Sequence, residues 1–270
     1  VNRGFDITLG ADIISTRDWR WNVTVMGSTL KNKVLKLTDN GEDIVNGVYI
    51  IREGQEINTF YMSKSAGVDP TTGEQLYWAY EKNADGSMKP GSEYMTNDAT
   101  VAAGCKYLQG SRIPDIYGSI SSSLKFRGFD LGLLFTYSLG GKIYDSIYNA
   151  MMEPSFVGQT YHRNALRTWT APGQRTDVPR TTTTASTQIT DRYLVDASYF
   201  AVKNISLGYS LPKGVLGKVG IESLRVYLSA DSPWIFTHLK GMNPQASFTG
   251  STSYSYTPNR TFTLGVDLKF

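Results

Sequence analysis

Strict alternation of apolar and polar side chains over strand-length stretches is the feature that most constrains the fold of this chain. In 260–270, Phe262, Leu264, Val266, Leu268 and Phe270 occupy the even positions, while Thr, Gly, Asp and Lys occupy the odd positions from 261 onward. A period of two gives a β-strand one apolar and one polar face. Seven stretches of roughly the 9 to 11 residues that a tilted membrane strand needs show this pattern. They are about 5–13, 19–28, 115–126, 129–139, 199–211, 223–231 and 260–270.

One of these stretches changes phase. In 199–211 the apolar residues Phe200 and Val202 lie at even positions, whereas Ile205, Leu207 and Tyr209 lie at odd positions. Without an irregularity, Lys203 would point into an apolar environment, which is costly unless its ammonium group reaches an interface. The sequence therefore predicts a β-bulge near Lys203 and Asn204.

The connections between the stretches alternate in length. Tight turns at 14–18 and 126–129 and a moderate turn at 212–222 contrast with long loops at about 28–114, 140–198 and 232–259. Short turns at one end and long extracellular loops at the other are typical of outer-membrane β-barrels. A soluble sandwich would show turns at roughly every 8 to 12 residues.

The chemistry of the two faces indicates which one meets lipid. The polar faces are rich in Ser, Thr, Gly, Asn and Asp and poor in Lys and Glu, which suits a hydrated lumen better than an outer protein surface. Aromatic residues cluster at strand ends, where membrane interfaces favour them: Trp19, Trp21, Phe126, Phe129, Tyr209 and Phe270. We therefore expect an all-β, transmembrane antiparallel β-barrel in the bacterial outer membrane.

The strand count and the composition narrow the function classes. Bacterial single-chain barrels have an even number of strands, so seven strands predict the C-terminal part of a larger barrel. The chain begins Val-Asn-Arg without Met, which predicts either a removed targeting segment or a piece of a longer protein. One Cys and two His residues make neither a disulfide framework nor a His/Cys metal site, and a net charge of +3 has no basic stripe for nucleic acid. No catalytic motif occurs, so we expect neither an enzyme nor a cofactor nor a metal.

Motifs along nearly the whole chain carry a family resemblance. They are 58–61 (NTFY) with 66–74 (AGVDPTTGE), 128–130 (GFD) with 134–142 (LFTYSLGGK), 198–200 (SYF) with 203–209 (KNISLGY), and 258–261 (PNRT) running into Phe270. In this order they resemble the C-terminal barrel region of SusC/RagA-type TonB-dependent outer-membrane transporters of Bacteroidetes. Singly each motif is weak, and together they are specific.

The resemblance implies a mechanism and partners. Such proteins have a 22-stranded barrel filled by an N-terminal plug, which this chain lacks. They draw energy from TonB, ExbB and ExbD and work under a SusD-like surface lipoprotein. Their substrates are oligosaccharides or peptides. The alternating C-terminal residues Phe262, Leu264, Val266, Leu268 and Phe270 also resemble the signal that the BAM machinery recognises during membrane insertion.

Two groups of side chains are candidate functional residues. Loop aromatics can contact a ligand or a lid, although packing within the loops is the more common role of such residues: Tyr77, Trp78, Tyr80, Tyr148, Tyr161, Trp169 and Trp234. Tyr254 and Tyr256 belong to the same set of loop aromatics. The polar faces carry charges expected to face the lumen and to pair with plug or wall groups: Asp115, Asp130, Arg225 and Asp267.

The expected function is TonB-dependent import of oligosaccharides or peptides with a lipoprotein partner. Two alternatives stay open. One is a non-transporting barrel that acts as an adhesin or assembly anchor, which a plug and a TonB box upstream would argue against. The other is a secreted carbohydrate-binding β domain, which would purify without detergent.

Overall fold

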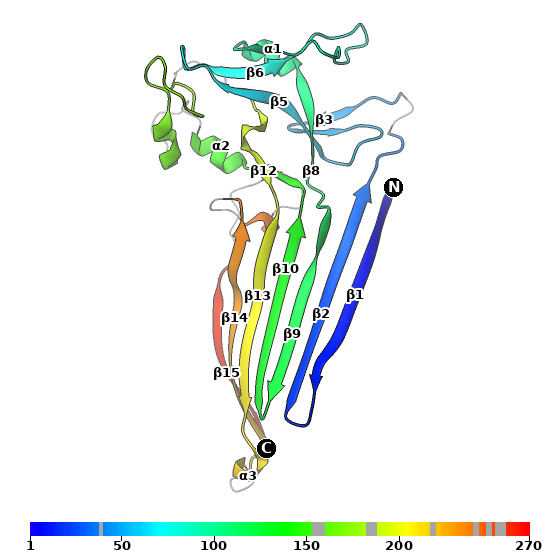
Figure 1. Ribbon diagram of the computed structural model, residues 1–270, viewed down its shortest axis with the longest axis vertical. Coiled ribbons are helices and arrows are strands. Elements are labelled where there is room, and N and C mark those ends of the chain that lie inside the picture. The colour runs from blue at the N-terminus through cyan, green and yellow to red at the C-terminus, as the bar shows by residue number, and fades with distance from the viewer. Residues whose placement is uncertain are drawn as a thin grey trace.

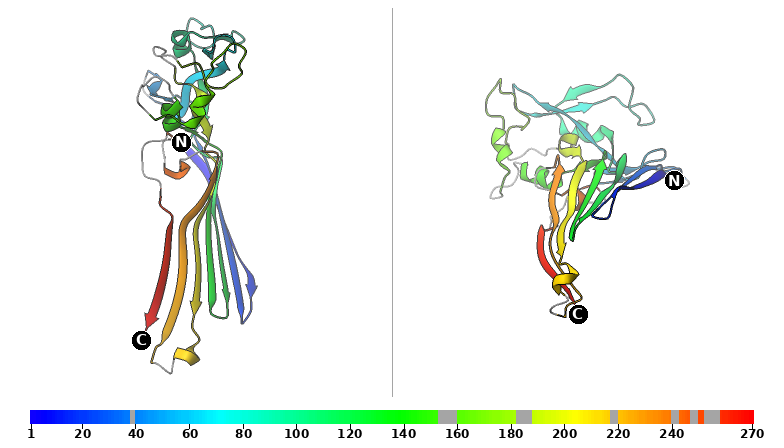
Figure 2. Two further views of the ribbon diagram at one scale, coloured as in Figure 1. Left: turned by 90° about the vertical axis from the view of Figure 1, so that its left-hand side faces the viewer. Right: turned by 60° about the horizontal axis from the view of Figure 1, so that its bottom comes forward.

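A computed structural model describes residues 1–37, 40–152, 160–181, 188–216, 220–239, 243–246, 250–251 and 258–270. The molecule has two parts (Figure 1). A tall antiparallel sheet, here called the wall sheet, carries at one end a second unit, here called the cap, which the segments 33–115 and 140–198 form. The chain starts beside the cap and ends at the opposite end of the wall sheet. The sheet curves across its width (Figure 2).

The wall sheet has seven strands in the order β1-β2-β9-β10-β13-β14-β15, and every neighbouring pair is antiparallel. The strands are β1 (Asn2–Ser15), β2 (Trp19–Asn32), β9 (Ile116–Phe126), β10 (Phe129–Leu139), β13 (Tyr199–Ser210), β14 (Ser223–Thr237) and β15 (Thr261–Lys269). The fold is all-β, as the alternation predicts. Three strands run beyond the expected ends: β1 spans Asn2–Ser15, β2 continues to Asn32 and β14 continues to Thr237.

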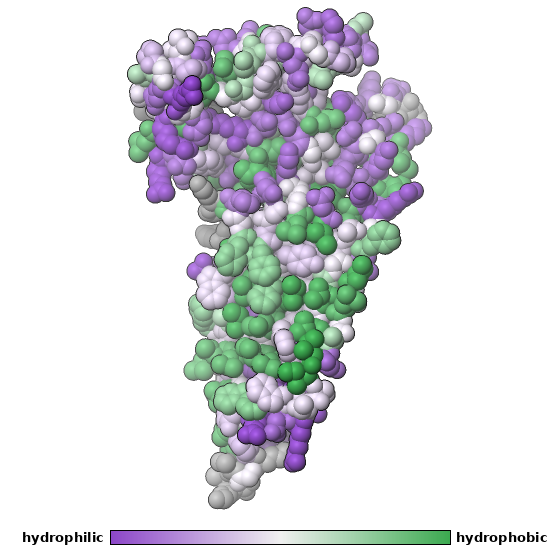
Figure 3. Space-filling view, in the orientation of Figure 1, coloured by the Kyte–Doolittle hydropathy of each residue, from purple (hydrophilic) through white to green (hydrophobic). Residues whose placement is uncertain are grey.

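The register joins the apolar residues of all seven strands into one face. One row of directly opposed residues crosses the whole sheet: Ile14, Trp21, Leu124, Leu131, Leu207, Leu228 and Leu264. Four of these side chains are exposed, Leu228 at 54% and Leu264 at 75% the most, whereas Trp21, Leu124 and Leu131 are half-buried. A hydrophobic band accordingly covers the strands between the polar cap and the short turns (Figure 3).

The predicted bulge is confirmed at Lys203. The pairing of β13 with both β10 and β14 skips this residue, so that Val202 returns to the apolar face opposite Phe135. The Lys203 ammonium donates a hydrogen bond to Gln245 Oε1 at 3.0 Å, and Gln245 Nε2 donates to Thr136 Oγ1 at 3.4 Å. Thr136 lies opposite Ser119 on the polar side of β10. The bulge therefore keeps the cation off the apolar face.

A second bulge, not expected from the sequence, interrupts β1. The pairing of β1 with β2 shifts between Asp12 and Ile14, and Ile14 rather than Ile13 lies opposite Trp21. The strict alternation expected up to Ile13 therefore ends one residue early.

The end of the wall sheet away from the cap has tight turns. Between β9 and β10 the loop is Arg127-Gly128, and both residues have positive φ, at 44° and 92°. This is the type I′ geometry that matches the twist of a hairpin. A Cβ on Gly128 would lie 2.7 Å from the carbonyl oxygen of Ser210, so the position has no room for a side chain. Arg127 Nη2 pairs with Asp18 Oδ2 of the adjacent β1–β2 turn at 3.0 Å.

The segments 28–114 and 140–198, which the sequence analysis describes as long loops, contain short strands and helices of their own. The first segment holds a sheet and one helix: β3 (Ile44–Asn46), β4 (Tyr49–Ile51), β5 (Thr59–Val68), β6 (Gln75–Ala79), β7 (Tyr94–Thr96), α1 (Ala99–Gly104) and β8 (Lys106–Ser111). The second holds β11 (Lys142–Tyr144), α2 (Ser146–Met152), η1 (Arg163–Arg167), η2 (Asp191–Tyr193) and β12 (Leu194–Asp196). The described residues contain two further short helices, α3 (Lys213–Leu216) and η3 (Pro244–Ala246).

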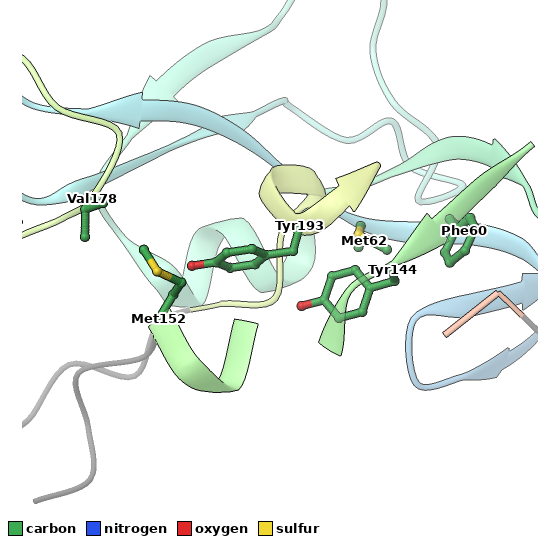
Figure 4. Packing of buried hydrophobic residues seen from close by; sticks show 6 residues of the cluster. All are labelled: Phe60, Met62, Tyr144, Met152, Val178 and Tyr193. Atoms are coloured by element: carbon green, nitrogen blue, oxygen red, sulfur yellow. The ribbon is translucent and has the colours of Figure 1, made fainter. Parts of the chain in front are cut away.

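The two long segments share a hydrophobic core in the cap (Figure 4). Its buried members are Phe60, Met62, Tyr144, Met152, Val178 and Tyr193. The first two belong to β5 and the other four to the segment 140–198. Burial of these large side chains stabilises the cap as one packed unit, because each removes apolar surface from water.

Candidate functional site

Aromatic residues mark two levels of the wall sheet. Near the short turns, Trp19, Phe126, Phe129 and Tyr209 lie on neighbouring strands in register. The Trp19 and Phe126 rings stack at 4.0 Å and those of Phe129 and Tyr209 lie at 4.5 Å. Near the cap, Tyr137 lies opposite Phe200, and Phe200 lies opposite Phe236. Positions 129 and 137 of β10 are roughly 27 Å apart along the strand. A strand tilt of about 40° reduces this to roughly 20 Å of height, which approaches the apolar band of about 25 Å that lies between two interfacial aromatic girdles.

Three of the four charges expected to face the lumen form one cluster on the polar face. Arg225 on β14 donates from Nε to Asp130 Oδ1 at 3.0 Å and from Nη2 to Asp130 Oδ2 at 2.7 Å. Its Nη1 reaches Asp267 Oδ2 on β15 at 3.3 Å. The guanidinium group can span β13 because residue 208 is glycine, where a Cβ would lie 2.6 Å from Arg225 Nη2. The cluster links β10, β14 and β15 by charge-assisted hydrogen bonds.

The fourth charge, Asp115, lies apart from this cluster. It precedes β9 at the cap end of the wall sheet, is exposed, and donates its backbone N–H to Leu139 O at 2.9 Å. That these four residues line a lumen stays a prediction.

Most of the candidate aromatics of the cap are packed rather than free. Tyr80 is 8% exposed and donates its hydroxyl to Lys106 O at 3.0 Å. Trp169 donates its Nε1–H to Pro70 O at 3.0 Å. The Tyr148 ring meets the Tyr193 and His162 rings edge-on at 5.7 and 4.9 Å. These contacts are those of loop cores, and a ligand role for these residues stays a prediction.

The other candidate aromatics are placed differently. Trp78 is half-buried, with the Lys64 ammonium 5.7 Å from its ring centre. Trp234 is 54% exposed on β14 of the wall sheet, and Tyr161 is 39% exposed. Tyr77 is almost wholly buried. Tyr254 and Tyr256 lie outside the described residues.

The turn 69–73 shows how the cap orders an exposed segment. Asp69 Oδ1 accepts the Thr71 N–H at 2.7 Å and Oδ2 accepts the Thr72 hydroxyl at 3.1 Å. The hydrogen bond from the Thr71 backbone lowers the pKa of the Asp69 carboxyl, with a smaller contribution from Thr72. Gly73, at φ 73°, closes the turn against the Trp169 ring. The Asp-Pro-Thr-Thr-Gly sequence therefore forms a turn held by its own side chains.

The cap contains a pocket of about 880 Å³, here called the cap pocket. That volume is in the range of small-molecule and peptide-residue sites. It lies between the start of β6, the N-terminal side of α1, η1 with its flanks, and η2. Of the candidate aromatics, Tyr77 and Tyr161 line it. The other lining residues come from separate segments of the chain, so no local sequence signal predicts them.

The charges of the cap pocket are unevenly compensated. Glu74 is engaged by Arg180 Nη2 at 2.8 Å and by Asn97 Nδ2 at 2.6 Å. Asp98 caps α1 by accepting the N–H groups of Thr100 and Val101. In contrast, Arg163 and Arg192 form no ion pair with any residue that the structure describes. Among the described lining residues, three arginines stand against two carboxylates, Glu74 and Asp98, so the pocket carries a net positive charge.

A smaller cavity of about 380 Å³ lies between the upper part of β13 and β14 and the segment around η3. Lys203, Asn243, Gln245 and Arg260 supply its polar lining, and Leu239 and Ile235 part of its apolar lining. Because the bulge directs Lys203 toward Gln245, this cavity depends on the same irregularity that the sequence predicts.

Within the described ranges, no group of three or more His, Cys, Asp or Glu side chains could hold a metal ion. None of the helices among the described residues is long and apolar enough to cross a membrane.

Comparison with known proteins finds relatives of similar sequence and a solved structure of similar architecture. No family model matches the chain. TonB-dependent receptor P3 of Formosa agariphila is 28% identical over the whole chain, and TonB-dependent receptor SusC of Bacteroides thetaiotaomicron is 24% identical, also over the whole chain. The solved structure of the RagAB peptide transporter covers the whole chain with a TM-score of 0.87 and 25% identity. Over its whole length the chain is similar to a segment of SusC/RagA-type TonB-dependent receptors.

The chain corresponds to only part of the length of each relative. The chain covers 28% of P3, 26% of SusC and 29% of the RagAB chain. The wall sheet belongs to an outer-membrane protein, which explains why its apolar face is exposed. The relatives are receptors and transporters rather than enzymes, in agreement with the absence of catalytic motifs.

Proposed function

We propose that this chain forms part of the barrel wall and the extracellular cap of a TonB-dependent transporter that imports oligosaccharides or peptides across the outer membrane. The observation that carries the proposal is the unbroken apolar face across seven strands, together with the likeness to the RagAB peptide transporter over the whole chain. The family resemblance adds a SusD-like surface lipoprotein as the partner and TonB, ExbB and ExbD as the source of energy.

In this proposal the two parts have different tasks. The apolar face of the wall sheet contacts lipid, and the polar face, with the Arg225 cluster, borders the hydrated interior that contains the plug. The chain is the C-terminal part of the barrel, and Phe262, Leu264, Val266, Leu268 and Phe270 guide insertion by the BAM machinery. The cap lies at the extracellular mouth, where substrate and lipoprotein meet the transporter.

The test is uptake by cells. A strain that carries the whole gene is compared with a strain in which the gene is deleted and with a strain that lacks TonB function, on a panel of fluorescent oligosaccharides and oligopeptides. The proposal expects at least one labelled compound to enter the periplasm only when both gene and TonB function are present. Surface attachment that persists without TonB function, with no uptake of any compound, would instead indicate an adhesin or assembly anchor.

A further inference from the structure

The cap pocket combines an apolar interior with an exposed apolar edge. Met152, Val178 and Tyr193 line it and are 4%, 4% and 6% exposed, so they form part of a packed floor rather than a flexible rim. Leu166, which also lines the pocket, is 87% exposed. An exposed leucine at the mouth of a pocket is a contact available to an apolar group of a ligand.

The same pocket carries free hydrogen-bond donors. Arg163 and Arg192 have no acidic partner among the described residues, while both acids of the lining, Glu74 and Asp98, are already engaged. The Arg192 guanidinium lies over the Tyr193 ring at 5.2 Å, an arrangement that leaves its N–H groups available. Planar guanidinium groups match the geometry of a carboxylate.

His162 adds a third donor to the lining. Its Nδ1 accepts the Asn164 N–H at 3.1 Å, which leaves Nε2 as the ring nitrogen that carries an N–H. The imidazole therefore offers this N–H on the side of the ring away from its own backbone contact. The complete pattern is an apolar floor with cationic and N–H donors around it.

We propose that the cap pocket binds the carboxyl end of a peptide whose last side chain is apolar. The terminal carboxylate pairs with Arg163 and Arg192, and the apolar side chain lies against Met152, Val178 and Leu166. The inference rests on the proposed function, because it selects one of its two substrate classes. A neutral oligosaccharide would leave both guanidinium groups without an anion and would place hydroxyl groups against an apolar floor.

The experiment uses the whole receptor extracted in detergent from outer membranes with any partner that co-purifies. Two fluorescein-labelled peptides, Ser-Gly-Ser-Gly-Leu with a free carboxyl end and the same peptide with a carboxamide end, are titrated by fluorescence anisotropy. The free acid is expected to bind at least about tenfold more tightly, since hydrogen bonds to a charged group are lost in the amide. Equal affinities would overturn the proposal.

Variants of the lining residues test whether the preference for the free acid arises in the cap pocket. The double variant R163Q/R192Q should lower the affinity for the acid to that for the amide and leave the amide unchanged. The matched control is R175Q, which removes an exposed arginine of the same segment that does not line the pocket. L166S should weaken the binding of both peptides and leave the ratio of their affinities unchanged. A tenfold acid preference that survives in R163Q/R192Q would contradict the assignment.

Failure of this inference is distinguishable from failure of the proposed function. Binding in detergent needs no energy from TonB, whereas uptake does. An acid preference without TonB-dependent uptake would leave the pocket assigned and remove the transport proposal. TonB-dependent uptake of an oligosaccharide, with no acid preference in the binding assay, would support the transport proposal and overturn the assignment of the pocket.

Discussion

At the scale of single residues, glycines on the wall sheet make room for long side chains that cross neighbouring strands. Tyr137 on β10 lies opposite Gly118 on β9, which lies opposite Gly27 on β2. The Tyr137 hydroxyl donates to Met26 O on β2 at 2.9 Å. A Cβ on Gly118 would lie 2.0 Å from that carbonyl oxygen and 2.8 Å from the Tyr137 hydroxyl. The glycine thus permits one tyrosine to tie three strands together.

This arrangement gives the first prediction. Gly118→Ala should destabilise the folded receptor by about 1–3 kcal/mol, since a backbone atom must move and the tyrosine loses its contact. Gly10→Ala is the matched control, because a Cβ there meets only Thr24 Oγ1 at an ordinary 3.5 Å. Urea unfolding in detergent, followed by tryptophan fluorescence, measures both. Equal stability of the two variants would contradict this account of Gly118.

Asp69 gives a prediction on pH. Its pKa is lowered in the folded turn by the Thr71 N–H, so the ionised carboxylate stabilises the turn. That contribution is complete above the pKa of the unfolded chain, about 4, and is lost as pH falls through the lower pKa of the folded state. Hydrogen exchange, corrected for intrinsic rates, should show loss of protection at 69–73 on acidification below about pH 4. Asp69→Asn should abolish this pH dependence, and an equal loss in both proteins would disprove it.

At the scale of elements, the sequence predicts the wall strands and misses the cap strands for a physical reason. A strand with lipid on one face and a polar interior on the other must alternate apolar and polar side chains. The change of phase in this alternation at Lys203 correctly predicts the position of a bulge. In the cap, β3, β4 and β7 have three residues each, too few for a period to appear. β5 is buried or half-buried along most of its length, so neither face is marked by exposed polar residues.

The candidate functional residues differ in the same way: those on the wall sheet are predictable from the sequence, and most of those in the cap are not. The link between Arg225 and Asp130 depends on the register of β10, β13 and β14, which alternation restricts. The cap pocket instead depends on how separate segments of the cap pack. Tyr77 and Tyr161 are accessible to sequence reasoning as loop aromatics, whereas Arg163 and Arg192 carry no local signal.

The wall strands give a prediction on the two faces of β14. Leu228 is 54% exposed on the apolar face and Ser229 is its neighbour on the polar face. Leu228→Arg should cost about 2–4 kcal/mol in a lipid bilayer, while Ser229→Arg should cost much less. Heat-modifiable migration in gels of outer-membrane fractions and urea titration in lipid vesicles measure the difference. A larger cost for Ser229→Arg would mean that the faces are assigned the wrong way round.

At the scale of the whole molecule, the arrangement of cap and wall separates recognition from membrane insertion. The cap lies at one end of the wall sheet, the tight turns lie at the other, and the exposed apolar band lies between them (Figures 1 and 3). The core around Phe60 and Tyr193 joins the segments 28–114 and 140–198, so the cap is a packed unit that three hairpins of the wall support. Such a unit can hold a binding pocket in a fixed position above the membrane.

The most direct test of the central claim is the intact mass of the native gene product, extracted from outer membranes in detergent, with the mass of whatever co-purifies. Since the chain covers only 26% to 30% of the receptors it matches, the account predicts a chain more than three times as long, together with a lipidated partner. Recovery of a 29.9 kDa chain, alone and in the soluble fraction, would contradict it.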